Sequence, residues 1–160
     1  MTVRFLSLLC ICSISVLWGL HKVNEIVLTL NCQEGMLTLI RAIKRGVLYH
    51  MPIHEIILQL PDGIFENSDI LHDMKEHGIA DTYSLHRSRF GYDFYTDRKL
   101  TEFLEQLGTF LVSEQILVCE EILAILTDLF EKRKKEYPCE RKLYITLGVT
   151  IGLGIVVLFL

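Results

Sequence analysis

The residues best suited to metal chemistry in this sequence are two histidines four positions apart, His50 and His54. Side chains with that spacing share one face of a helix, and imidazole is a common ligand for zinc. Pro52 stands between them, so a regular helical turn across both is not expected. His72 and Asp73 resemble a ligand pair in residue type only. We therefore interpret these histidines as surface or loop residues.

Other chemistry-bearing residue types form no recognisable catalytic motif. The sequence has no P-loop, dinucleotide fingerprint, nucleophile elbow or zinc pattern. Its acidic pairs, such as Glu120 with Glu121 and Glu102 with Glu105, have the spacing of solvated helix faces. The five cysteines lack ligand-like spacing and are interpreted as reduced, small hydrophobic residues. The sequence predicts a protein that is not an enzyme and binds no cofactor, with a membrane-bound enzyme as a remote alternative.

Two long uncharged runs lie in residues 5–20 and 143–160, and they explain the high hydrophobic content of 51%. The second run would be about 27 Å long as a helix, close to the roughly 30 Å hydrocarbon core of a bilayer. It also lacks the polar stripe of a helix in a soluble core. We predict one transmembrane helix at residues 1–22 and another at 143–160, around a middle domain at 23–142.

The first run has an alternative interpretation as a signal peptide, because Arg4 precedes a moderate apolar stretch. Cleavage requires small residues of the A-x-A type, and residues 15–19 offer no good site. Trp18 lies near the end of the run, where an interfacial aromatic side chain belongs. We therefore expect a retained membrane helix.

Basic residues predict the orientation. Lys132, Arg133, Lys134, Lys135, Arg141 and Lys142 precede the second run, and no basic residue follows it. The positive-inside rule then places the middle domain in the cytoplasm and both termini outside. The run at 132–135 sets topology and contacts anionic lipid head groups in one interpretation, and binds an acidic partner in the other.

The middle region has a net charge of 15 − 20 = −5, which gives no reason to expect nucleic-acid binding.

The middle domain is predicted to be helical, because apolar residues recur there at helical spacing. A stripe over 36–48 is followed by Pro52, which can open a short helix, and by a turn at 61–63. Further helices are expected at 64–75 and from Asp81, then a loop at 90–95. A long helix from 98 to 136 is expected to begin after an N-cap at Thr96-Asp97. Gly108 would be its one interruption and Pro138 its break or kink. The predicted fold is all-α, with an antiparallel pair of long helices.

The second uncharged run contains a small-residue pattern. Gly148 and Gly152 are four positions apart and Gly154 follows, which permits close contact with another helix. The partner could be the first span of the same chain or another protein, and generic glycine use in a membrane span is an equal alternative.

The chain resembles the stage III sporulation protein AB family of endospore-forming bacteria. The resemblance spans nearly the whole length and is firmest in the last third, where Phe103, Leu107, Gly108 and Gln115 match one motif. Gly148 and Gly152 match the family's final span. Two positions depart from the family pattern: Leu104 replaces a glycine and Leu111 an aspartate.

This resemblance implies a function that spacing alone does not. The family is similar to the platform protein F domain of type II secretion systems. It implies a non-catalytic subunit of a channel complex joining the mother cell to the forespore, required for endospore formation. The implied partners are other stage III sporulation channel proteins and a secretion-type ATPase, with a homo-oligomer as a further option. The alternative is a two-span membrane adaptor or regulator unrelated to sporulation.

Overall fold

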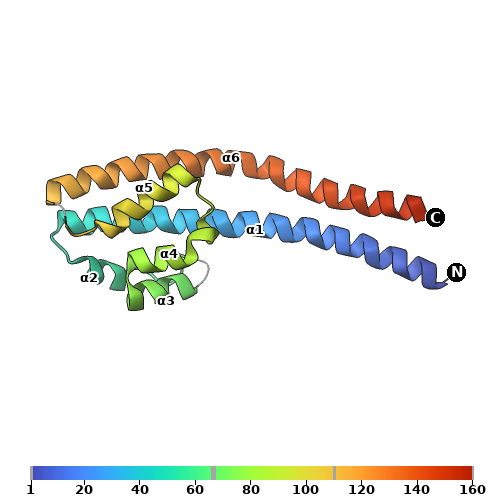
Figure 1. The fold of residues 1–160 in the computed structure, drawn as a ribbon, viewed down its shortest axis with the longest axis horizontal. Coiled ribbons are helices and arrows are strands. Elements are labelled where there is room, and N and C mark those ends of the chain that lie inside the picture. The colour runs from blue at the N-terminus through green and yellow to red at the C-terminus, as the bar shows by residue number, and fades with distance from the viewer. Residues whose placement is uncertain (1, 66–67, 110, 160) are drawn as a thin grey trace. The chain divides into compact units, whose positions relative to one another are not determined.

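The described part of the chain is entirely helical. A computed structural model gives the backbone of residues 2–65, 68–109 and 111–159 and the side chains of 13–65, 69–109 and 111–157 (Figure 1). No strand occurs in those ranges, which confirms the predicted all-α class. The outer ends of the two predicted spans, at 1–12 and 158–160, lie outside the described side chains. The helices are α1 (Thr2–Leu48), α2 (Ile53–Leu58), α3 (Ser68–His77), α4 (Ile79–Phe90), α5 (Phe94–Glu105) and α6 (Val112–Phe159).

The chain divides into two compact units. Unit 1 comprises Met1–Val27 and Arg133–Leu160, and unit 2 comprises Leu28–Lys132. Helices α1 and α6 each contribute residues to both units, whereas α2 to α5 belong to unit 2 alone. Unit 1 therefore contains the two uncharged runs, and unit 2 contains most of the predicted middle domain.

Unit 2 is built on the antiparallel ends of α1 and α6 (Figure 1). In α1 the fully buried side chains include Met36, Leu39, Ile40 and Ile43. Their spacing of three and four residues keeps them on one helix face. In α6, Cys119, Ile122 and Leu126 are buried with the same periodicity. At the surface, Lys44 Nζ of α1 donates to Glu120 Oε1 of α6 at 2.7 Å, and Lys99 of α5 pairs with Glu121 of α6.

Helix α2 packs on α1 at a glycine. A Cβ atom added to Gly46 would lie 2.2 Å from Ile56 Cδ1, so any larger residue there would force the Ile56 side chain to move. Pro52 precedes α2 with an extended backbone, which confirms that proline as the start of this short helix. The turn predicted around Pro61 is also present, with Gly63 at a φ of 121°.

Several predicted boundaries from α3 onward are wrong. Helix α3 begins at Ser68 rather than 64, α4 begins at Ile79 rather than Asp81, and the loop after α4 covers only 91–93. The N-cap of α5 is Asp93, whose carboxylate accepts a hydrogen bond from the Tyr95 backbone amide at 3.3 Å. An Asp is as good an N-cap as the predicted Thr-Asp pair, and it stands three residues earlier.

The predicted single helix over 98–136 is also wrong. Helix α5 ends at Glu105, and α6 begins at Val112. Gly108 lies between them at a φ of 89°, a conformation that reverses the chain instead of interrupting a helix briefly. The break that was one of the two predicted outcomes at Pro138 is wrong, because α6 continues through this residue. A proline removes one helical hydrogen bond, and the kink that was the other predicted outcome at Pro138 stays a prediction.

The positive φ of Gly108 leads to a stability prediction. Replacing it with alanine should lower the free energy of unfolding by about 1 kcal/mol, because a side chain strains this backbone conformation. The added Cβ itself would lie 3.4 Å from Ile53 Cδ1, an ordinary contact. Denaturant unfolding of the full chain in detergent micelles measures the effect. Gly108→Asn is the control, because asparagine tolerates a positive φ better and should lose less.

Membrane-crossing capacity is visible in one helical stretch of the described residues. Ser13–Leu48 is long and apolar enough to span a bilayer, with a mean hydropathy of 1.2 in its most apolar window. Of that window, 44% is buried within the protein, and core helices of soluble proteins meet the same criteria. Two membrane helices flanking a cytoplasmic domain remain a prediction.

Candidate interaction sites

A close approach of α1 and α6 in unit 1 lies at a pair of glycines. A Cβ atom on Gly148 of α6 would lie 2.8 Å from the backbone oxygen of Ser15, and one on Gly19 of α1 would lie 2.8 Å from that of Tyr144. Such contacts are too short for any side chain, so the backbones of α1 and α6 are in direct contact. Trp18 packs beside this crossing, with its ring centroid 6.5 Å from that of Tyr144 in an edge-on arrangement.

Gly148 therefore packs against the first uncharged run of the same chain, and contact with another protein stays a prediction. Gly152 is also buried, whereas Gly154 is exposed and a Cβ added there would meet nothing within 4 Å. Sequence analysis missed the other half of the crossing. Ser15 and Gly19 are four positions apart, and this small-x-x-x-small spacing is the signal that would have identified it.

The remaining predicted site residues belong to unit 2 and are mostly internal. Phe103 and Gln115 are buried, and Leu107 is half-buried against the core. Gly108 is the exposed turn residue described above. The motif made of Phe103, Leu107, Gly108 and Gln115 thus contributes three side chains to the helical core. Its glycine lies in the turn between α5 and α6.

The two departures from the family pattern lie in contrasting surroundings. Leu104 is 4% exposed and belongs to the hydrophobic core of unit 2. Leu111 is 70% exposed, just before the start of α6. Leu104 therefore contributes apolar contact to the core, whereas Leu111 places an apolar side chain in solvent.

A polar network joins α4 to α5 inside unit 2. Tyr83 Oη donates to Asp97 Oδ1 at 2.6 Å, and the guanidinium of Arg87 pairs with the other oxygen of the same carboxylate. Burial raises the pKa of Tyr83 well above its usual range. The carboxylate is buried but has two donors, so this network stabilises the helix pair and carries no unpaired reactive group.

A second carboxylate contact joins α3 to α4. His86 Nε2 lies 2.6 Å from Asp73 Oδ2, and that hydrogen bond holds the pKa of Asp73 below its ordinary value. The sequence had placed Asp73 next to His72, but His72 approaches Glu76 instead, at 3.3 Å.

Across the described residues no group of three or more His, Cys, Asp or Glu could hold a metal ion. His50 and His54 are both exposed.

The Asp73 contact predicts an acid-sensitive contribution to stability. A carboxyl group with a lowered folded-state pKa stabilises the fold above its unfolded pKa of about 3.9, and that stability is lost as the pH falls through the folded value. The difference in unfolding midpoint between the wild type and Asp73→Asn should therefore shrink below about pH 4. Thermal unfolding between about pH 3 and pH 6 tests this expectation. A difference that is constant across that range would contradict it.

Buried thiol chemistry is not favoured in α6. Cys119 is buried, and this burial raises the pKa of its thiol to about 11. A thiol of that pKa is almost wholly protonated at neutral pH and is a poor nucleophile. Cys139, by contrast, is exposed.

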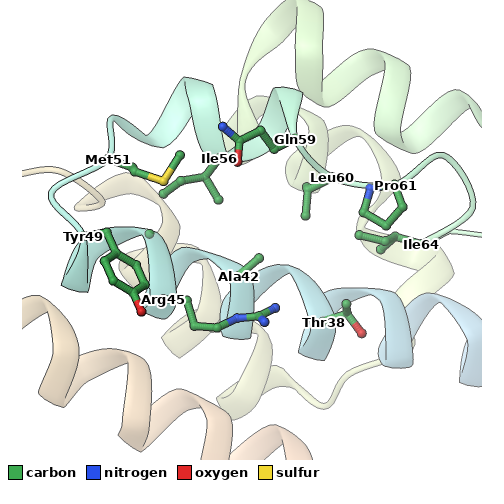
Figure 2. A pocket seen from close by; sticks show the side chains of 11 residues that line it. Thr38, Ala42, Arg45, Tyr49, Met51, Ile56, Gln59, Leu60, Pro61 and Ile64 are labelled. Carbon is green, nitrogen blue, oxygen red and sulfur yellow. The ribbon is translucent and has the colours of Figure 1, made fainter.

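An open groove lies between α1 and α2 in unit 2, with a volume of about 370 Å³. Figure 2 shows Ile56 and Leu60 directed from above toward Ala42 of α1, with Arg45 lying along the helix below them. The lining is mainly apolar and also includes the guanidinium of Arg45 and the amide of Gln59. Nothing in the groove resembles a catalytic arrangement.

No protein-family model matches this chain, and neither a curated protein nor a solved structure matches it.

Proposed function

We propose that this chain is a non-catalytic membrane subunit of a sporulation channel, acting as a platform for other proteins. In this proposal it lies in the mother-cell membrane facing the forespore, with unit 2 in the cytoplasm. Its partners are other stage III sporulation channel proteins and a secretion-type ATPase. The motif resemblance described above supplies the sporulation context.

The observation that best supports an anchored platform is the glycine crossing of unit 1. Two uncharged runs from opposite ends of the chain pack backbone to backbone at Gly19 and Gly148. In a bilayer, where the hydrophobic effect does not drive helices together, such close approach is a principal source of association. A hairpin of that kind would fix a cytoplasmic helical unit at the membrane without any catalytic residue.

Gene deletion tests the biological role. A clean deletion in the native host should abolish spore formation and forespore gene expression, and a wild-type copy should restore both. Intact sporulation in the deletion strain would reject the proposal. Expression confined to vegetative growth would favour the second candidate, a two-span membrane adaptor outside sporulation.

Topology is tested separately through Cys139, which is exposed and precedes the second uncharged run. In a variant that keeps only this cysteine, a membrane-impermeant maleimide should label the protein in opened cells but not in intact ones. A cysteine placed after the second run should react in intact cells. Labelling of Cys139 from outside would reverse the predicted orientation.

A further inference from the structure

Four cationic side chains gather on one face of α6 in unit 1, just before the uncharged run. Lys134 and Arg141 are seven positions apart, as are Lys135 and Lys142. Seven residues are nearly two helical turns, so each pair lies on one line along the helix. All four residues are exposed. We call them the basic face; they span about 12 Å along the helix at 1.5 Å per residue.

The two acidic residues between the members of the basic face, Glu136 and Glu140, lie elsewhere on the helix. Pro138 is one turn from each member of the basic face and therefore marks its centre. Glu136 and Glu140 are each two positions from Pro138, which points them to the opposite side. Helix α6 is continuous through the proline, so the separation of charge around the helix is retained. Glu131 is the exception, because it lies three and four positions before Lys134 and Lys135 and shares their face. Arg141 and Lys142 have no acidic residue three or four positions away, so the positive charge is least balanced at the end of the face next to the uncharged run.

We infer that the basic face binds the phosphate groups of anionic phospholipids. The inference rests on the membrane location in the proposed function. If residue 143 enters the hydrocarbon, Arg141 and Lys142 lie in the head-group layer, which is roughly 5–7 Å thick per leaflet. Lys134 and Lys135 then lie within a further Debye length of about 8 Å. Cations at that depth attract anionic lipid strongly.

Trp18 provides a local probe of the lipids around this face. It is the only tryptophan of the chain, is partly exposed, and packs against Tyr144, which follows the basic face directly. The full-length protein is reconstituted in phosphatidylcholine vesicles containing either brominated phosphatidylglycerol or brominated phosphatidylcholine. Bromine quenches tryptophan fluorescence at short range, so the ratio of quenching reports enrichment of the anionic lipid. We expect an enrichment of about fivefold at low salt, falling toward unity at high salt.

Two charge-matched double variants test the face itself. Lys135→Gln with Lys142→Gln removes two charges from the basic face, and the enrichment should fall below about twofold. Lys132→Gln with Arg133→Gln removes the same charge from positions outside the face, and most of the enrichment should remain.

The other outcomes each reject a defined statement. An equal loss in both doubles would mean that net charge, not this face, attracts lipid. No enrichment in the wild type would also overturn the inference and favour an acidic protein partner. Both results leave the membrane location intact. A full chain that fails to float with pure phosphatidylcholine vesicles would overturn the membrane location and, with it, the lipid inference.

Discussion

Replacing Phe90 with alanine should lower the free energy of unfolding of unit 2 by about 3–5 kcal/mol, the usual cost of truncating a buried phenylalanine. Phe90 is 0% exposed. Its ring lies 5.2 Å from that of Tyr83 and 6.1 Å, nearly parallel, from that of Tyr92, while Phe65 meets it edge-on at 6.3 Å. Alanine would remove the centre of this aromatic cluster and leave a cavity.

The same residue also fixes the end of α4 to α1. Its backbone oxygen accepts a hydrogen bond from Gln33 Nε2 at 2.7 Å. Alanine would keep this backbone hydrogen bond but lose the ring contacts with Tyr83 of α4 and with Tyr92, which precedes α5. Loss of the ring should therefore loosen α4 and α5 together. Amide hydrogen exchange of the full chain in detergent micelles should show faster exchange throughout both helices.

Phe94 is the matched control, because the same substitution there removes a ring that is 80% exposed. Phe94→Ala should change the free energy of unfolding by no more than about 0.5 kcal/mol. Equal losses for Phe90→Ala and Phe94→Ala would mean that the aromatic cluster does not hold unit 2 together.

Helical periodicity predicted the fold class and the main buried stripes of unit 2. The stripe predicted over 36–48 is buried in α1 except at its last member, Leu48, which is exposed. The short helix after Pro52 begins where a proline can open a helix. Both features depend on local spacing, which is written in the sequence. The errors arise where two local signals competed. Asp93 and Thr96-Asp97 are all acceptable N-caps, and only tertiary packing selects the first.

The Gly108 region and Pro138 illustrate a second reason why the sequence alone does not predict where helices end. A glycine in an amphipathic stretch can interrupt a helix or reverse the chain, and the choice depends on whether the following helix can pack back on the first. Here Lys99 of α5 pairs with Glu121 of α6, which requires the reversal. Proline breaks or kinks many helices. Whether Pro138 does so also depends on its neighbours in the fold, which the sequence does not reveal.

The candidate sites were predicted in part. Gly148 and Gly152 were identified by their spacing, and both are buried in the structure. Gly19 was not predicted, because Ser15 and Gly19 lie in a run whose most obvious features are its hydropathy and its likeness to a signal peptide. The contacts of Asp73 and Asp97 join separate helices, and no local pattern marks pairs of that kind.

Replacing Gly148 with leucine should separate α1 from α6 in unit 1 and cost at least about 2 kcal/mol. A side chain there meets the Ser15 backbone oxygen at 2.8 Å, and backbone cannot move aside as a flexible side chain can. Leucine favours the bilayer, so insertion itself should persist. The readout is the fluorescence of Trp18, which loses its contact with Tyr144 when the helices part.

Gly154→Leu is the control for this substitution, because a Cβ at that position would meet nothing within 4 Å. It adds the same side chain to the same uncharged run, and Trp18 emission should remain that of the wild type. The comparison separates packing from hydrophobicity. If both variants retain wild-type emission and thermal stability in bilayers, the glycine crossing does not hold the two runs together, and the anchored hairpin loses its main support. If only Gly148→Leu changes the emission and the thermal stability, the variant should next be tested in a deletion strain. Failure of Gly148→Leu to restore sporulation there would connect the glycine crossing directly to the proposed platform role.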